Sequence, residues 1–323
     1  MASKKIPKGG QSLPLFSDAG TPNRNIQTTQ RDSRLPKGLS PTEYEIDESD
    51  GLPREIVGPW IRDKHTRLQR YVNISGVGVR RKWLSHPKSA GATYIELLSG
   101  PGRVRIESES KAIDGSPVVA WRESVAVKAP FTQVWIADRD SNLKAAAETR
   151  LLGLGAPVQA RVGAAADTVD EIVINLNPHA LHFAFLDPYD LAALPFDVIK
   201  KLAQLERMDI LIHFSTLDLN RNLLEYIKRQ SSPLDTFAPG WRDKIDDFGR
   251  PQEYIRGRIF QHWRGLLKGV GMDTAEAAEL VTGSTNQPLY WLAFAARHPR
   301  ALDFWEKIRR IDPDTASLLT LRE

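Results

Sequence analysis

An aspartate, a proline and a tyrosine follow directly after an apolar run in the second half of the chain. The run Phe183–Leu186 has the composition of a buried strand, and it delivers Asp187, Pro188 and Tyr189 to the end of that strand. Asp187 can accept hydrogen bonds from an amine and so orient its lone pair, and a carboxylate can also take or relay a proton. Pro188 stiffens the turn, and Tyr189 offers a face for stacking. The same residues also fit an ordinary turn after a strand, so the pattern leaves both interpretations open.

A second candidate site is a glycine-rich turn that follows an earlier predicted strand, residues 94–98. Two glycines one residue apart let the backbone pass close to a ligand and adopt positive φ. Ligands of open parallel sheets sit just beyond the carboxyl ends of the strands, where Glu96 could contact the ammonium group of an amino-acid moiety. The candidate binding residues are Glu96, Ser99, Gly100, Pro101 and Gly102. A purely structural turn is an equally good interpretation of so short a motif.

An acidic residue closes the next predicted strand, residues 133–137. Asp138 could accept hydrogen bonds from both ribose hydroxyls of a nucleoside, with Arg139 beside it. Gly102 and Asp138 are 36 residues apart, which exceeds the roughly 20 residues typical of dinucleotide-binding units. An insertion around residues 114–117 would account for the excess. Alternatively, the acidic run only caps a helix, because Asp140 stands directly before a helical pattern.

Strands and helices alternate at short intervals through the middle of the chain. This alternation predicts an α/β fold with a mostly parallel sheet and right-handed crossovers, which would bring the three candidate loops to one edge. The predicted strands are 94–98, 133–137, 158–162, 182–186 and 209–214. The predicted helices are 60–72, 142–152, 168–176, 196–205 and 219–228.

The pattern changes near the C-terminus. Residues 277–281 and 288–296 read as two strands joined by a turn, which predicts an antiparallel hairpin at the end of the parallel sheet. Residues 215–272 form a predicted helical insertion after the fifth strand, with a helix at 254–268. A last helix is predicted at 301–311. The folded domain is therefore expected to span residues 57–323.

Residues 1–50 are rich in Gly, Pro, Ser, Thr, Asn and Gln and lack apolar periodicity, so we expect a disordered tail. Seven Lys or Arg and two Asp give residues 1–40 a net charge of +5, whereas the whole chain carries only +4. A solvated tail is the simpler interpretation, and an arm that contacts phosphates is the alternative. The folded part has no net basic charge that would mark it as a nucleic-acid surface.

Composition excludes several kinds of chemistry. The 323-residue chain has no cysteine, which rules out disulfides, thiolate metal sites, a cysteine nucleophile and an iron–sulfur cluster held by this chain. Its lack of cysteine fits a reducing cytoplasm, and neither a membrane span nor a secretory signal is predicted. His65, His182 and His213 lack metal-ligand spacing and are interpreted as structural. Trp241 and Trp263 are interpreted as core residues, with base stacking as the alternative.

The order of these motifs resembles the three-Cys-motif partner protein family, which has class I methyltransferase character. The resemblance covers nearly everything after residue 57. It rests on a Gly-Pro-Trp segment followed by a helix with a lysine, an acidic Gly-Pro-Gly loop, a Gly-Ser-Pro, a Phe-Leu-Asp-Pro-Tyr segment, an Asn-Arg-like pair and a final Phe-Trp helix. The matching residues are Gly58–Trp60, Lys64, Glu96–Gly102, Gly115–Pro117, Phe185–Tyr189, Arg221-Asn222 and Phe304-Trp305.

The resemblance implies a class I methyltransferase (Rossmann-like) fold with S-adenosylmethionine as cofactor, held by the glycine loop, Asp138, Arg139 and Gly163. It also implies a partner, a separate three-cysteine protein similar to radical S-adenosylmethionine proteins. This sequence departs from the family after the third strand. The family has an acidic residue after the glycine there, which would hold the adenine amine, whereas this chain has Gly163 followed by Ala164–Ala166 and then Asp167.

Two functions are expected from these features. The first is methyl transfer from S-adenosylmethionine to an amine, most plausibly on a nucleic acid base, with Asp187, Pro188 and Tyr189 holding the acceptor. A base in a duplex would have to be flipped out of the stack. The second is a non-catalytic or weakly catalytic subunit that uses the same fold to bind a partner, since a fold does not fix a function.

Overall fold

The computed structural model describes residues 43–245, 248–275, 279–282 and 288–309. Among these residues, no helix combines the length and the apolar character needed to cross a membrane. Most of the predicted basic tail, the predicted turn of the C-terminal hairpin and the chain after residue 309 lie outside the described residues.

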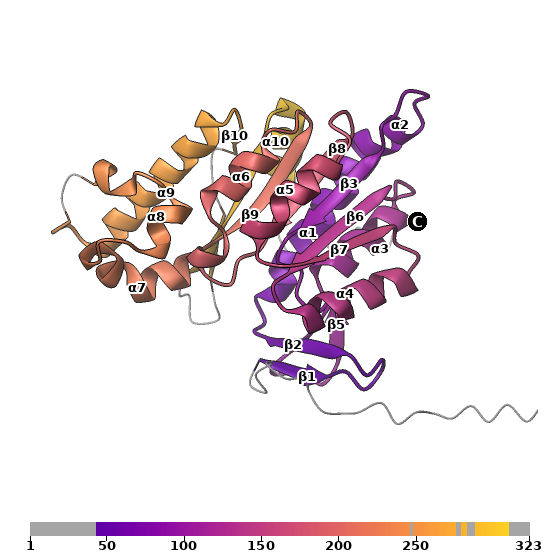
Figure 1. Ribbon diagram of the computed structural model, residues 1–323, viewed down its shortest axis with the longest axis horizontal. Helices are drawn as coiled ribbons and strands as arrows, with labels where there is room; N and C mark the ends of the chain where they lie inside the picture. Colours follow the sequence, from indigo (N-terminus) through magenta and orange to yellow (C-terminus); the bar gives the residue numbers. More distant parts are fainter. Residues whose placement is uncertain (1–42, 246–247, 276–278, 283–287, 310–323) are drawn as a thin grey trace, which may run out of the picture. The chain divides into compact units, whose positions relative to one another are not determined.

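A large sheet organises the chain, with its strands in the order β10-β12-β9-β8-β3-β6-β7 and β11 paired to β12 (Figure 1). Strands β7, β6, β3, β8 and β9 are parallel, and β12 runs antiparallel to both β9 and β11. The prediction of a class I methyltransferase-type, mostly parallel sheet that ends in an antiparallel hairpin is confirmed. The strands are β3 (Ala92–Glu96), β6 (Gln133–Asp138), β7 (Val158–Val162), β8 (Leu181–Leu186), β9 (Met208–Ser215), β10 (Asp273–Thr274), β11 (Glu279–Thr282) and β12 (Pro288–Ala296).

Helices cover both faces of this sheet, because successive strand residues point to opposite faces and both faces are apolar. In β3, Tyr94 belongs to one core cluster and Ile95 to the other. The Tyr94 face packs against α1 (Ile61–Ser75), α3 (Ser116–Ala126), α4 (Ser141–Gly153) and α10 (Pro299–Arg309). The Ile95 face packs against α5 (Ala165–Asn175) and α6 (Phe196–Leu202).

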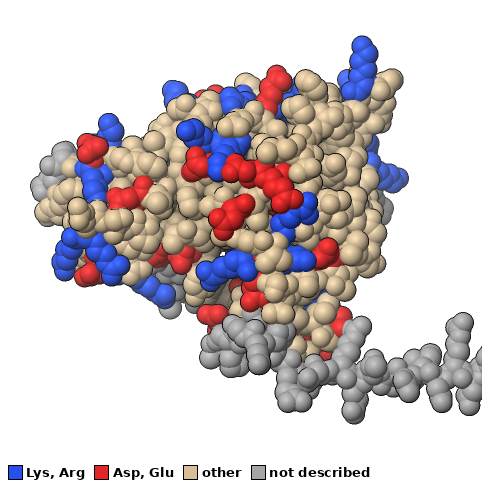
Figure 2. All heavy atoms as spheres, in the orientation of Figure 1, with Lys and Arg blue, Asp and Glu red and all other residues tan. Residues whose placement is uncertain are grey.

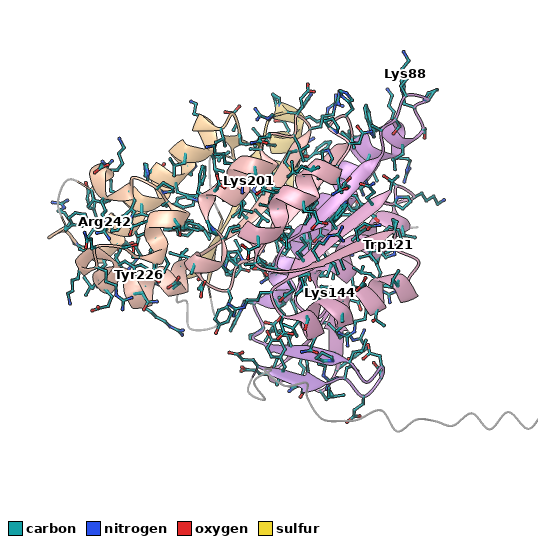
Figure 3. All side chains as sticks on the ribbon, in the orientation of Figure 1. Lys88, Trp121, Lys144, Lys201, Tyr226 and Arg242 are labelled. Carbon is teal, nitrogen blue, oxygen red and sulfur yellow. The ribbon has the colours of Figure 1, made fainter. Side chains whose placement is uncertain are left out.

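A helical segment follows β9, as predicted. It consists of α7 (Thr216–Lys228), α8 (Pro233–Phe237), the 3-10 helix η3 (Trp241–Lys244) and α9 (Gln252–Gly269), at the left of Figure 1. Trp241 and Trp263 are fully buried, which confirms their interpretation as core residues and leaves no face free for a base. Tyr226 and Arg242, labelled in Figure 3, lie in this segment, where the Arg242 guanidinium donates to the Tyr226 carbonyl at 2.7 Å.

A second, smaller sheet was not predicted. Its strands are β1 (Tyr44–Ile46), β2 (Pro53–Val57), β4 (Arg103–Ile106) and β5 (Ala112–Asp114), in the order β1-β2-β4-β5. The prediction that residues 1–50 are disordered is therefore wrong for residues 44–46. Its short strands alternate charged and apolar residues. Ion pairs such as Arg105–Glu45 at 2.5 Å stabilise them and connect segments that are far apart in the sequence. Strands β4 and β5, together with α3, account for the long spacing between Gly102 and Asp138.

The remaining elements are short. The π-helix η1 (Gly76–Arg80) and α2 (Arg81–Leu84) continue α1, and the 3-10 helix η2 (Leu191–Ala193) follows β8. Acidic and basic side chains intermingle over α5 and α6 on the face shown in Figure 2. Lys201, for example, pairs with both Asp170 at 2.9 Å and Asp197 at 3.0 Å. This face therefore presents mixed charge rather than a uniformly basic patch.

Candidate functional site

The loops that follow β3, β6 and β8 lie next to one another, because β3 pairs with β6 on one side and with β8 on the other. The Gly100 amide donates to Asp138 Oδ2 at 2.9 Å, which ties the first loop to the second. The Gly163 amide donates to the Asp138 carbonyl at 3.0 Å, which adds the loop after β7. The structure thus brings the predicted Gly100, Asp138, Gly163 and Asp187 loops to one edge of the sheet.

The backbone of the glycine loop needs both of its glycines. Gly100 has φ +54° and Gly102 has φ +73°, in the left-handed region that other residues rarely adopt. A Cβ on Gly102 would lie 3.3 Å from the Ala147 Cα on α4. Gly115 closes the loop from the other side, since its amide donates to the Gly102 carbonyl at 2.9 Å. Ser99 and Pro101 are buried within this turn.

Asp138 is nearly buried, and both of its carboxylate oxygens already accept backbone hydrogen bonds. Oδ2 accepts from Gly100, and Oδ1 accepts from the Asp140 amide at 2.9 Å. Burial raises the pKa of Asp138, although these two hydrogen bonds oppose the shift. Each carboxylate oxygen can accept more than one hydrogen bond, so acceptor capacity remains for a ligand hydroxyl. Arg139 is exposed, and Asp140 is the N-cap of α4, as the alternative interpretation expected.

Glu96 does not face a ligand-accessible space. Its side chain is fully buried and accepts hydrogen bonds from Tyr94 Oη at 2.6 Å and from Ser116 Oγ at 2.5 Å. Burial raises the pKa of Glu96 to about 8, against the lowering effect of these two hydroxyls. The predicted contact with an ammonium group is not made from this position. Glu96 instead joins the end of β3 to the start of α3, beneath the glycine loop.

Asp187 lies between two basic groups that approach from different elements. Lys64, near the start of α1, forms an ion pair with Asp187 Oδ2, and His213 Nδ1 on β9 lies 2.5 Å from Asp187 Oδ1. Burial alone would raise the pKa of Asp187, but Lys64 and His213 outweigh it and hold the pKa well below its usual range. Asp187 is therefore an ionised carboxylate with a cation on one oxygen and an imidazole on the other.

His213 was interpreted as structural, and its ring instead takes part in this cluster. Burial lowers the pKa of His213, although Asp187 opposes the shift. An ionised carboxylate only accepts, so the neutral imidazole carries its hydrogen on Nδ1 and keeps a bare lone pair on Nε2. Nε2 is buried and has no hydrogen-bond partner among the residues that the structure describes, and the Tyr290 ring lies edge-on to the imidazole with centroids 4.3 Å apart.

The other predicted residues of the Asp-Pro-Tyr segment differ in exposure. Pro188 is buried, whereas 80% of Tyr189 is exposed. The turn after Tyr189 is fixed to α7, because Asp218 accepts from the Leu191 amide at 2.8 Å and from Tyr226 Oη at 2.7 Å. A rigid turn therefore presents an exposed aromatic ring next to the Asp187 cluster.

Two residues at this edge come from the unpredicted small sheet. Glu55 on β2 lies near Gly100, where a Gly100 Cβ would be 3.7 Å from its Oε2. Burial raises the pKa of Glu55 to about 7, opposed by nearby Lys64. Burial also raises the pKa of Tyr44 on β1, and the negative charges of Glu55 and Asp138 raise it further. Sequence reasoning missed both residues, because they lie in a segment without apolar periodicity. Lys64, in contrast, was already marked by the family resemblance.

The loop after β7 lacks an acidic side chain next to its glycine. Gly163 has φ +152°, and Ala164 is the N-cap of α5 without a side-chain hydrogen bond. Asp167 is exposed in the first turn of that helix. Its Cβ lies 3.8 Å from the position that a Gly163 Cβ would take, so Asp167 is the acidic residue nearest to this loop. Within the described part of the chain, no cluster of His, Asp and Glu side chains could hold a metal ion.

No protein-family model matches the chain, and no curated protein matches it. Among solved structures, it is similar to an O-methyltransferase from Bacillus cereus in complex with SAH, at 14% identity and a TM-score of 0.42, over 74% of this chain and 82% of that one. It is also similar to the O-methyltransferase TomG from Streptomyces achromogenes in complex with SAM, at 12% identity and a TM-score of 0.40, over 72% and 79% of the two chains. P. horikoshii TYW2 in complex with MeSAdo is similar at 8% identity and a TM-score of 0.35, over 80% and 74%. At these identities the similarity is one of fold.

Proposed function

We propose that this chain binds S-adenosylmethionine at the carboxyl edge of its sheet and transfers the methyl group to an amine. The observation that carries the proposal is the convergence of a glycine loop, a carboxylate and an Asp-Pro-Tyr turn, linked by the Gly100–Asp138 hydrogen bond. Open α/β sheets bind their ligands at this edge, where the strand order reverses. Here the reversal falls between β3 and β8, because the chain continues from β3 to β6 and β7 on one side and from β8 to β9 on the other.

The cofactor would lie across the loops after β3, β6 and β7. The left-handed glycines Gly100 and Gly102 let its amino-acid end approach the backbone, and Asp138 accepts from the ribose hydroxyls with its remaining lone pairs. The adenine would lie over Gly163 and be held by backbone groups, since Ala164 supplies no carboxylate. Arg139, which is exposed beside Asp138, could contact the cofactor from the solvent side.

The acceptor would lie beside Asp187, Pro188 and Tyr189. The amine nitrogen attacks the methyl carbon, the carbon–sulfur bond breaks, and S-adenosylhomocysteine leaves while the amine loses a proton. His213 Nε2 has no hydrogen-bond partner among the described residues and is buried in the ligand-free chain. It would take that proton after a movement that uncovers it, and Asp187 would stabilise the imidazolium that forms. The exposed Tyr189 ring can stack on a planar acceptor, which favours a nucleic acid base taken out of its stack.

A second candidate is a non-catalytic subunit that partners a three-cysteine protein similar to radical S-adenosylmethionine proteins. Two observations favour it. The loop after β7 lacks the acidic residue of the family, and both oxygens of Asp187 are already engaged by Lys64 and His213. In this case the fold would serve recognition, and any cluster chemistry would belong to the cysteine-containing partner.

Calorimetric titration with S-adenosylmethionine separates the two candidates. We expect binding by the wild-type chain and its loss in Asp138→Ala, with unchanged binding in Asp170→Ala, which removes an acidic residue 60% exposed on α5. Labelled methyl transfer to pools of DNA, RNA and protein then identifies the acceptor. Absence of cofactor binding at millimolar concentration would exclude the enzyme and favour the subunit.

A further inference from the structure

A cavity of about 510 Å³ lies at the opposite edge of the large sheet from the candidate site. Its lining includes Ala92, Leu181 and Met208, the first residues of β3, β8 and β9. The glycine loop, Asp138 and Asp187 follow the last residues of their strands, so the two sites are separated by the length of the strands. The volume is within the range of roughly 300 to 1,000 Å³ that is typical of small-molecule sites.

Aromatic side chains form much of the wall of this cavity. They come from α1, α2, β8, α10 and the turn before β6, and they are Tyr71, Trp83, Phe183, Phe304 and Phe131. The centroids of the Tyr71 and Phe183 rings lie 4.8 Å apart at an interplanar angle of 47°, so these two wall residues pack against each other without a ligand. Such a surface favours a flat, apolar molecule, since aromatic rings prefer offset or tilted contacts.

Basic side chains surround the apolar wall. Four arginines line the cavity, against two acidic residues, Glu206 and Asp209. Burial raises the pKa of Asp209 to about 7, and its carboxyl group accepts from Tyr71 Oη at 2.6 Å. Among the described residues, none of the four arginines forms an ion pair with a carboxylate. These arginines are Arg80, Arg207, Arg297 and Arg300. The cavity therefore has an excess of positive charge.

Arg80 is the last residue of the π-helix η1. π-Helices are rare in proteins, and those that occur are frequently found at functional sites. The Arg80 guanidinium is buried, donates to the carbonyls of Ala129 at 2.7 Å and Val72 at 3.1 Å, and lies 4.2 Å from the centroid of the Phe131 ring. The charge of Glu123 acts on Arg80, but no carboxylate of the described residues forms an ion pair with it. A buried cation without such a pair is costly unless another anion compensates it. The π-helix thus fixes a positive charge in the wall of an aromatic cavity.

His182 adds an unsatisfied polar group to the same wall. Its Nε2 lies 3.0 Å from the Asn177 carbonyl, so the hydrogen is on Nε2 and the Nδ1 lone pair is bare. Nδ1 is buried and has no partner in the described part of the chain, although buried polar atoms are usually paired. Burial lowers the pKa of His182 to about 4, which keeps the ring neutral.

We propose that this cavity is a second binding site, for a small aromatic molecule that carries a negative charge. The rings of the wall contact its apolar body, and the arginines neutralise its anionic group, with exposed Arg300 at the start of α10. The site does not depend on the proposed methyl transfer, because no residue of the carboxyl edge takes part in it.

Calorimetry with naphthalene carboxylate as the probe, and the uncharged naphthalene carboxamide as its matched control, tests this proposal on the full chain. We expect the carboxylate to bind more tightly than the carboxamide. Arg300→Gln should weaken carboxylate binding by about fivefold, the size of one exposed charge interaction, and leave carboxamide binding unchanged. Lys228→Gln, a charge removed from the surface of α7, should change neither.

Ala301→Trp provides a second, steric test, because Ala301 is buried in the cavity wall and an indole there would fill the space. It should abolish binding of both probes while circular dichroism and binding of S-adenosylmethionine stay as in the wild-type chain. Failure of the folded wild-type chain to bind naphthalene carboxylate would overturn the proposal. Equal affinity for both probes, unaffected by Arg300→Gln, would overturn the assignment of an anionic ligand.

Discussion

Lys64 and Asp187 form an ion pair although 123 residues separate them in the sequence. Lys64 lies near the start of α1 and Asp187 directly follows β8, and both side chains are largely buried. The pair therefore connects the first helix over the sheet to the strand that carries the candidate catalytic turn. His213 on β9 completes the cluster, so three elements fix the position of one carboxylate.

Replacing Lys64 should destabilise the fold. Lys64→Met keeps the apolar stem but leaves the buried Asp187 with only His213 as a partner, and we expect a loss of about 3 kcal/mol in the free energy of unfolding. Lys201→Met is the matched control, since Lys201 pairs with carboxylates that are 60% exposed, and it should cost less than about 1 kcal/mol. Denaturant unfolding measures both. Equal losses of unfolding free energy in the two variants would show that the buried Lys64–Asp187 pair stabilises the fold no more than the exposed pairs of Lys201.

Asp187→Asn should separate catalysis from cofactor binding. The amide keeps the shape of the side chain, but its single oxygen faces the donor Lys64, so its NH2 group donates to His213 Nδ1 and selects the wrong tautomer. It also lacks the negative charge that would stabilise an imidazolium. We expect methyl transfer to fall by at least about 100-fold, the scale of a lost proton-transfer group, with the affinity for S-adenosylmethionine nearly unchanged. Single-turnover transfer and calorimetry give the two values. A parallel loss of both would contradict the proposed role.

Tyr189→Ala should affect only the acceptor. Because 80% of the Tyr189 side chain is exposed, its removal should leave the unfolding midpoint and cofactor affinity unchanged. Loss of one stacking contact should weaken binding of a single-stranded nucleic acid by about 1 to 3 kcal/mol. Tyr189→Phe is the control and should retain binding. Wild-type affinity in Tyr189→Ala would argue against a stacked base.

Gly102→Ala should damage the cofactor loop. The residue has φ +73°, and the new Cβ would press on α4 at Ala147, so we expect a destabilisation of about 1 kcal/mol or more together with weaker S-adenosylmethionine binding. Gly257→Ala is the matched control, because Gly257 lies inside α9 with open space around it. That change should stabilise the chain by up to about 1 kcal/mol. Thermal unfolding with and without cofactor measures each effect.

The buried Glu96 should make stability fall as the pH rises. Its pKa is about 8 in the folded chain, against 4.5 for an ordinary glutamate. Between these values the folded state holds a proton that the unfolded state has released, so the contribution of Glu96 is complete below pH 4.5 and is lost as the pH passes 8. Glu96→Gln removes this titration and should flatten the dependence. Denaturant unfolding from acidic to mildly alkaline pH provides the test, and identical slopes in both proteins would falsify it.

The sequence determined the type of the large sheet and the edge at which its loops lie, whereas the order of its strands came from the structure. Short apolar runs such as Phe183–Leu186 are typical of buried strands, and their alternation with helices favours parallel pairing. Parallel pairing brings the glycine loop, Asp138 and Asp187 to one edge. The glycines at 100 and 102 were recognisable for the same local reason, since their conformations suit no other residue.

Tertiary structure decided what each side chain does at that edge. Glu96 is an acidic residue at a strand end, but its burial against Tyr94 and Ser116 gives it a structural role, in which it connects β3 to α3. His213 has the sequence context of a core residue, and only the approach of Asp187 across two strands gives it a bare Nε2. Glu55 and Tyr44 join the site through a sheet of charged, short strands. Contacts between segments far apart in sequence have no periodic signature, because they depend on packing rather than on the local pattern of the chain.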